Sequence, residues 1–388
     1  MIARRAAAQP AARRWAGLGA TFAAGLGLAT LLVLSGCSAD KPPPTPLEAY
    51  TPRIAGKQVW AHSLGTPAPH LSVAVVEGRF VLASRGGDVL TLDAATGAES
   101  SRVSVRGRIQ AGVGADSRFA AVVTDANELV VVDATQERWR VTLPSPVVTA
   151  PLVAGGRVFI QAVDRSVSAF DVLDGRKLWS YARAADPLAL SQPGVLLPYK
   201  DTLLVGVGSR LVGLDPLQGT VRSDSQVASP RGTNEVERLA DLVGPAGRVA
   251  ETVCARAFQV AVTCLNAERA SLLWSRNQGG FQGIAADADQ VYAADSSDRI
   301  SVWKRANGDL AWTTERLRNR GLSAPLAAGS TVVFGDAQGW LHFLGRDKGE
   351  TLLRLSTDGS PIVAPLVRSQ ITLLAVTRKG GVFAFRPE

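Results

Sequence analysis

Short apolar runs separated by turn residues repeat along the chain from about residue 50 to its end. Val, Leu and Ile dominate these runs, and Gly, Asp and Asn stand between them, as at 79–84, 89–92, 157–162 and 167–170. There is little of the three-to-four-residue periodicity that indicates amphipathic helices. Runs of this length bounded by turn residues are typical of strands, so the pattern predicts an all-β domain.

A longer repeat groups the predicted strands into units. In its fullest copy, Asp171-x-x-x-Gly175-x-x-x-Trp179, Asp ends a strand, Gly takes the positive φ of the turn, and Trp packs between units. Aligned at the Trp position, the copies fall at Trp60, Ser101, Trp139, Trp179, Ser223, Trp274, Trp312 and Leu353. They are separated by between 38 residues (101 to 139) and 51 residues (223 to 274), about the length of one four-stranded propeller blade.

The two ends of the chain complete each other. The segment around Trp60 has no strand before it, and the C-terminal strand at 382–385 has no turn and Trp after it. Pairing the two would complete one blade and leave no open sheet edge. We therefore expect an eight-bladed β-propeller of four-stranded antiparallel blades, closed by the N- and C-terminal strands. Seven blades is the alternative, because the stretch 101–139 is degenerate.

The N-terminus has the order of an export signal. Four arginines (Arg4, Arg5, Arg13, Arg14) precede an apolar stretch at 15–33, and Leu34-Ser35-Gly36-Cys37 resembles a lipobox. An uncleaved membrane anchor is the alternative, but several glycines dilute the apolar stretch. We expect a cleaved signal peptide at 1–36, a lipid on Cys37, a Pro-rich tether at 37–52 and the propeller at 53–388.

Charge and cysteine content narrow the classes of function. The chain carries a net charge of +8, and removing the four signal arginines leaves 8 − 4 = +4. No Lys/Arg cluster alternates with aromatic residues, so nucleic acid is not an expected partner. Cys254 and Cys264 stand on two neighbouring predicted strands. In an oxidising compartment they can form a disulfide, and two buried free thiols are the alternative.

The repeat resembles that of quinone-type propellers, which quinone-dependent dehydrogenases share with the outer-membrane β-barrel assembly factor B (BamB) lipoproteins. A lipobox, a Pro-rich tether and a single propeller of this length resemble the BamB family, as do the segments 232–241 and 333–342. The resemblance implies a scaffold of the Bam complex. It would bind the BamA subunit and other Bam subunits, assist insertion of β-barrel proteins, and contact unfolded β-barrel clients transiently. It also implies lipid anchoring at the periplasmic face of the outer membrane.

The same resemblance suggests contact residues. The family's partner-facing Leu-x-Leu-Arg loop corresponds here to Leu188, Leu190 and Ser191, and an acidic position corresponds to Asp241. Ser191 lacks the guanidinium of the family's Arg, so the contact is either more apolar or uses a nearby Arg such as Arg183 or Arg210. The insertion at 223–243 departs most from the repeat, and its residues 234–242, after Thr233, are a candidate short helix.

An enzyme is not expected. The three histidines, His62, His70 and His342, have no metal-ligand partner at helical or hairpin spacing, and no vicinal cysteine pair is present. Asp336 and His342 are interpreted as a turn acid and a strand residue rather than a catalytic pair. The sequence therefore predicts no cofactor and no metal. A generic propeller that binds peptidoglycan, sugar or another envelope protein remains the alternative function.

Overall fold

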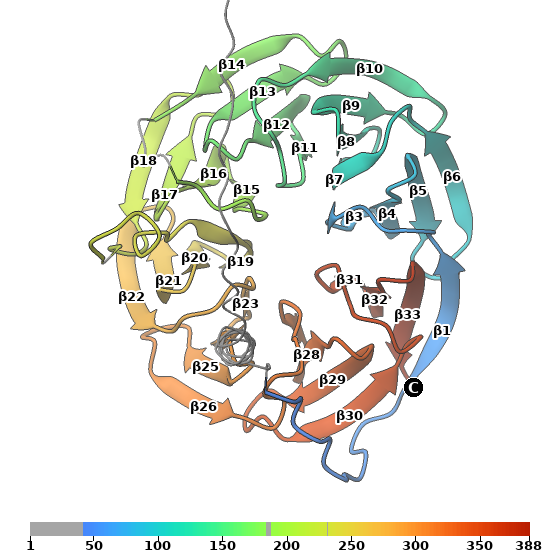
Figure 1. Ribbon diagram of the computed structural model, residues 1–388, viewed down its shortest axis with the longest axis vertical. Helices are drawn as coiled ribbons and strands as arrows, with labels where there is room; N and C mark the ends of the chain where they lie inside the picture. The colour runs from blue at the N-terminus through green and yellow to red at the C-terminus, as the bar shows by residue number, and fades with distance from the viewer. Residues whose placement is uncertain (1–41, 184–187, 231) are drawn as a thin grey trace, which may run out of the picture. The chain divides into compact units, whose positions relative to one another are not determined.

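The computed structural model describes residues 42–183, 188–230 and 232–388, and all its regular elements there are β-strands. The strands form eight antiparallel sheets arranged around a ring (Figure 1). The all-β prediction and the count of eight blades are thus confirmed, and seven blades is excluded. Within the described ranges, no helix has the length and apolar content to cross a membrane.

We number the blades in chain order and give their strands from the ring centre outward. The first four blades have the following strands. Blade 1 is β3 (Ala74–Val76), β4 (Arg79–Ala83), β5 (Asp88–Asp93) and β6 (Glu99–Ser104). Blade 2 is β7 (Ile109–Ala115), β8 (Ala120–Thr124), β9 (Glu128–Val132) and β10 (Glu137–Thr142). Blade 3 is β11 (Leu152–Ala154), β12 (Arg157–Gln161), β13 (Val167–Asp171) and β14 (Lys177–Tyr181). Blade 4 is β15 (Leu196–Tyr199), β16 (Thr202–Val207), β17 (Arg210–Leu214) and β18 (Val221–Gln226).

The remaining four blades complete the ring. Blade 5 is β19 (Leu242–Val249), β20 (Thr252–Ala257), β21 (Ala261–Asn266) and β22 (Ser271–Asn277). Blade 6 is β23 (Ala285–Ala286), β24 (Gln290–Ala294), β25 (Ile300–Lys304) and β26 (Leu310–Thr314). Blade 7 is β27 (Leu326–Ala328), β28 (Thr331–Gly335), β29 (Trp340–Gly345) and β30 (Thr351–Ser356). Blade 8 is β31 (Val367–Ser369), β32 (Thr372–Val376), β33 (Gly381–Pro387) and β1 (Gly56–Ser63).

Both termini of the propeller meet in blade 8. β1 pairs with β33 in antiparallel register from Gly56 opposite Pro387 to Ser63 opposite Gly381, which confirms the predicted closure. The two-residue strand β2 (His70–Leu71) adds a parallel edge to β7. The stretch 101–139, degenerate in sequence, nevertheless supplies β7 to β9 of a complete blade, because its strands keep their buried apolar residues.

In the five blades whose repeat keeps its Trp, that residue joins the blade to the next. Its indole N–H donates to a carbonyl in the outer turn of the following blade: Trp60 to Ala94 (3.2 Å), Trp139 to Val172 (2.8 Å), Trp179 to Pro216 (3.1 Å), Trp274 to Arg305 (2.7 Å) and Trp312 to Arg346 (2.7 Å). The ring lies against the turn glycine, as Trp139 does against Gly175. A methyl carbon at Gly175 would lie 2.6 Å from Cε3 of Trp139. The glycine is therefore needed both for its φ of 74° and for its missing side chain.

The alternating strand directions create two faces. The turns between the second and third strands lie on the same face as the loops that lead from one blade to the next. We call this face the linker face, and the opposite one, with the remaining turns, the turn face. Residues far apart in sequence meet on the linker face because the loops of neighbouring blades lie side by side there (Figure 1).

The predicted helix at 234–242 is wrong. Residues 235–238 form a single turn, and the Asn234 side chain before it accepts a hydrogen bond from the amide of Glu237 (2.9 Å). Leu242 already belongs to β19, opposite Ala257. A segment this short forms too few helical hydrogen bonds to offset the free-energy cost of helix nucleation. Its last residue, Leu242, pairs in a strand instead.

Candidate partner-binding surface

The residues suggested by the family resemblance lie on the linker face at blades 3 to 5. Leu188 and Leu190 are half-buried in the loop from β14 to β15, and Asp241 directly precedes β19. The sequence places Asp241 some fifty residues after the two leucines. The ring brings them together because both loops border blade 4.

Arg165 links these loops. It lies in the turn between β12 and β13 with a φ of 67°, and its side chain is 10% exposed. Its Nε donates to Oδ1 of Asp241 (2.7 Å), and its Nη2 donates to Oδ2 of Asp241 (3.0 Å) and to the carbonyl of Leu188 (2.9 Å). A two-pronged Arg–carboxylate pair is the strong, directional kind of ion pair. We call Arg165, Leu188, Leu190 and Asp241 the clamped surface.

The sequence did not reveal Arg165. The arginines proposed to replace the family's Arg, Arg183 and Arg210, instead bind the two carboxylate oxygens of Asp224. Burial alone would raise the pKa of Asp224, but the hydrogen bonds from Arg210 and Arg183 outweigh it and the pKa is lowered. This ion cluster belongs to blade 4 and the loop that precedes it, beside the clamped surface on the same face.

Asp336 and His342 form a buried cluster with Arg320. His342 Nε2 lies 2.9 Å from Oδ2 of Asp336, and Arg320 Nε donates to the same oxygen (2.8 Å). Asp336 and His342 are fully buried. The Asp336 Oδ1 atom accepts the amides of Gln338 (2.8 Å) and Trp340 (2.9 Å), which closes the β28–β29 turn. Asp336 therefore has the role of a turn acid, and His342 lies on β29 with no exposed surface.

The pKa directions agree with a structural cluster. Desolvation lowers the pKa of His342, despite the opposing effect of Asp336, and favours the neutral ring. Burial by itself would raise the pKa of Asp336, but hydrogen bonds from His342, Trp340 and Arg320 lower it. At neutral pH the charged partners are therefore Arg320 and Asp336, with His342 donating as a neutral ring.

The residues that the structure describes assemble no metal centre. There, no group of three or more His, Cys, Asp or Glu side chains could hold a metal ion. His62 lies on β1 at the rim, and His70 lies on β2 beside the channel at the ring centre. The innermost strands and the residues just before them line this channel, largely with small and apolar side chains such as Pro151, Val195 and Ala324.

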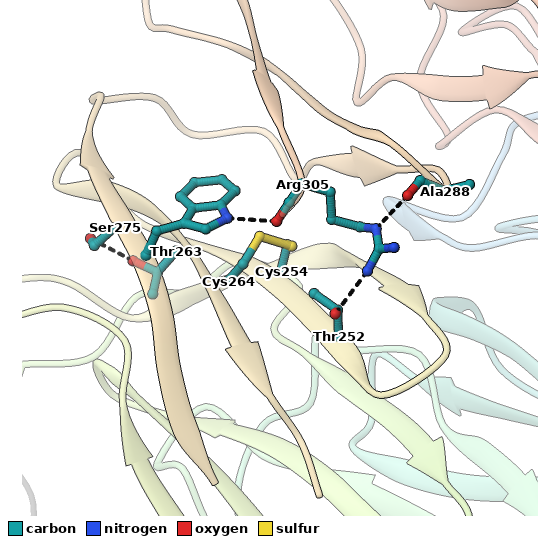
Figure 2. Close-up of a disulfide and its surroundings, with 8 residues drawn as sticks. Thr252, Cys254, Thr263, Cys264, Ser275, Ala288 and Arg305 are labelled. Carbon is teal, nitrogen blue, oxygen red and sulfur yellow. Dashed lines mark hydrogen bonds between the residues drawn. A yellow bond between two sulfur atoms is a disulfide. The ribbon is translucent and has the colours of Figure 1, made fainter. Parts of the chain in front are cut away.

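Cys254 and Cys264 are joined by a disulfide between β20 and β21. They face each other in the strand register, with Cα atoms 4.0 Å apart, and both are fully buried beside Trp274. Figure 2 shows the bridge near Arg305, whose side chain reaches the carbonyl of Ala288 and the hydroxyl of Thr252. The disulfide thus fastens the centre of blade 5 close to its contact with blade 6.

We expect the bridge to persist in the exported protein. Since both sulfurs are buried, free thiols would also be unreactive in the native state, so the test requires denaturation. In guanidinium without reductant, an alkylating reagent should leave Cys254 and Cys264 unlabelled, and after reduction it should label both. A Cys264→Ala variant, as control, should label at Cys254 without reduction. Labelling of the unreduced, denatured protein at both positions would refute the bridge.

The fold and the clamped surface together define a class of protein: an eight-bladed propeller with Trp-over-Gly contacts between blades and a pinned, partly apolar surface on one face. Residues 85–314, more than half of the chain, match the family described as outer membrane protein assembly factor BamB. The chain belongs to this family, as its sequence resemblance predicted.

Individual relatives support the assignment. A protein from Burkholderia pseudomallei (strain K96243), named outer membrane protein assembly factor BamB, is 33% identical over 92% of this chain and 96% of its own length. The crystal structure of BamB from Moraxella catarrhalis matches with a TM-score of 0.78 at 22% identity, over 85% of this chain and 99% of that one.

The fold alone does not separate the family from enzymes. Quinohemoprotein alcohol dehydrogenase from Comamonas testosteroni matches with a TM-score of 0.65 at 15% identity, over 86% of this chain and 76% of that one. The relatives found by sequence are assembly factors and not enzymes, although they share the propeller fold with quinohemoprotein dehydrogenases.

Proposed function

We propose that this chain is a lipid-anchored, non-catalytic scaffold of the Bam complex, which binds a BamA-like subunit through the clamped surface. It would act at the periplasmic face of the outer membrane and assist the assembly and insertion of β-barrel proteins. The names of its relatives support the role in outer-membrane assembly. The lipid on Cys37 follows from the lipobox, which lies outside the described residues.

The Arg165 clamp is the observation that carries the proposal. Arg165 ties the carboxylate of Asp241 to the backbone of Leu188, so two loops from different blades are held in one arrangement before a partner arrives. A preorganised surface loses less conformational entropy on binding. The half-buried Leu188 and Leu190 would then provide the apolar centre of an interface, surrounded by charged residues.

Photocrosslinking in cells tests this assignment. A benzoylphenylalanine placed at Leu188 or Leu190 should capture the periplasmic domains of a BamA-like subunit. The same group at Leu173 or Leu217 is the control, because these leucines are 64% and 60% exposed on the turn face. Capture of the subunit only from the control positions would refute the clamped surface. Capture of a different envelope protein from Leu188 would instead support a generic binding propeller.

The same crosslinks address the further proposed partners. Other Bam subunits and unfolded β-barrel clients would appear as additional adducts, identified by mass spectrometry. A soluble cofactor or substrate is not part of the proposal.

A further inference from the structure

Residues 44–53 lie on blade 7 as an extended segment, which we call the strap. Figure 1 shows it in blue beside β30. At one end the amide of Thr45 donates to the carbonyl of Arg318 (3.0 Å), in the linker-face loop before β27. At the other end the amide of Arg53 donates to the carbonyl of Leu352 (3.0 Å), on β30. The strap therefore runs from the linker face along the outer edge of blade 7.

Several side chains of the strap contact the propeller. Leu47 packs against the apolar cluster between blades 6 and 7, which includes Trp312. The carboxylate of Glu48 accepts the hydroxyl of Thr351 (2.9 Å) and pairs with Arg316 (3.4 Å). These contacts cover an outer strand edge that would otherwise be open, so the strap belongs to the folded propeller.

Two buried arginines of the propeller, Arg320 and Arg354, bind the strap. Arg320, which also binds Asp336, donates to the carbonyl of Thr45 (3.0 Å). Arg354, whose side chain is 7% exposed, donates to the carbonyl of Glu48 (2.6 Å) and stacks on Tyr50 at 4.6 Å. The hydroxyl of Tyr50 in turn accepts the amide of Arg354 (2.7 Å).

Docking of the strap also has a free-energy cost, because polar groups beside it lose their hydration. Release of the strap would restore that hydration. Desolvation lowers the pKa of Arg354, which indicates that water is withheld from its charge. Arg354 Nε and an oxygen of Glu350 are buried without a hydrogen-bond partner among the described residues. Exposure to water would satisfy both groups. The stabilisation that the strap gains from its contacts is thus partly offset by the lost hydration of these groups.

We propose that the strap docks reversibly and sets the length of the membrane tether. This inference rests on the lipid anchor at Cys37. With the strap docked, only residues 38–43 span the gap between lipid and propeller, about 19 Å at roughly 3.1 Å per residue for a Pro-rich chain. With the strap released, residues 38–55 are available and the reach rises to about 56 Å at the same rise per residue. The propeller could then follow a partner that moves away from the bilayer.

Hydrogen exchange of the full mature protein tests the docking itself. The amides of Thr45 and Arg53 should be protected in the wild type, yet exchange faster than amides of the inner strand β28. A Glu48→Ala/Tyr50→Ala variant should speed exchange at both amides at least tenfold and leave β28 unchanged. Thr51→Ala, at an exposed strap position, is the matched control and should change neither amide.

Three results would overturn the proposal. In the first, the amides of Thr45 and Arg53 are unprotected in the wild type. In the second, the double variant does not change their exchange rates. In the third, they exchange as slowly as the amides of β28. The last result would mean a permanently docked strap.

Neutron reflectometry of the lipidated protein on a supported bilayer tests the consequence. The double variant should sit farther from the bilayer, or over a broader range of distances, than the wild type and the Thr51→Ala control. Equal distances would contradict the role in tether length. Failure of the lipid anchor would give a different result, because a protein that takes up no labelled palmitate at Cys37 would not remain on the bilayer at all. The exchange experiment does not depend on the anchor.

Discussion

Replacing Asp336 by alanine is expected to lower the free energy of unfolding by about 3–5 kcal/mol, the range found when one partner of a buried ion pair is removed. The change leaves Arg320 charged, 3% exposed and without its carboxylate. It also removes the acceptor of His342 and of two backbone amides in the β28–β29 turn. Urea denaturation of the purified variant measures the effect.

Asp295 provides the matched control. It holds the equivalent turn of blade 6, where its carboxylate accepts the amides of Ser297 (2.8 Å) and Arg299 (3.0 Å). Its ion-pair partner Arg299 is 46% exposed, and the buried Arg256 senses its charge but bonds to backbone carbonyls instead. Asp295→Ala therefore breaks no buried hydrogen-bonded ion pair and should cost less than Asp336→Ala. A combined Asp336→Leu/Arg320→Met variant should lose less than Asp336→Ala alone, because it leaves no unpaired guanidinium. Equal costs for Asp336→Ala and Asp295→Ala would contradict this account of the cluster.

The second large effect is expected at the contact between blades. Gly175→Ala should cost about 2–5 kcal/mol, from roughly 1–2 kcal/mol for a side chain at positive φ and about 1–3 kcal/mol for overpacking against Trp139. Gly155→Ala separates the two contributions, because Gly155 has a φ of 57° and nothing within 4 Å of the added carbon. The control should lose only the φ contribution. If denaturation midpoints of the two variants fall equally, the Trp-over-Gly contact does not hold the blades together.

Much of the fold could be predicted because its determinants are local and repeated. Asp171, Gly175 and Trp179 lie within nine residues, and each acts through a turn or through a neighbouring blade. The closure by β1 and β33 followed from what each chain end lacked. The helix at 234–242 was predicted wrongly because a local capping pattern has no information on strand pairing, and Leu242 pairs with Ala257 in β20.

The site was less accessible from the sequence. Arg165 and Asp241 are 76 residues apart, and neither the repeat nor any local pattern connects them. Sequence proximity to Ser191 favoured Arg183 and Arg210 as replacements for the family's Arg, but both are engaged with Asp224. Only the ring arrangement, which brings the β12–β13 turn against the loop before β19, reveals the pairing of Arg165 on blade 3 with Asp241.

The strap illustrates the same limit. Pro-rich composition indicated a tether up to residue 52, but composition does not reveal which part of such a segment finds a partner. Glu48 and Tyr50 meet Arg354, about three hundred residues later, because blade 7 is next to the blade that β1 completes. The lipid on Cys37 remains a prediction from the lipobox.

The central claim is that the clamped surface holds a BamA-like subunit, and affinity purification from detergent-solubilised envelope tests it most directly. The tagged wild-type chain should recover the subunit. A Leu188→Glu/Leu190→Glu variant should recover at least tenfold less, since each added carboxylate would be desolvated in the interface. A Leu173→Glu/Leu217→Glu variant, with the same charges on the turn face, should recover as much as the wild type. Undiminished recovery by the Leu188→Glu/Leu190→Glu variant, or no recovery of such a subunit by the wild type, would contradict the account.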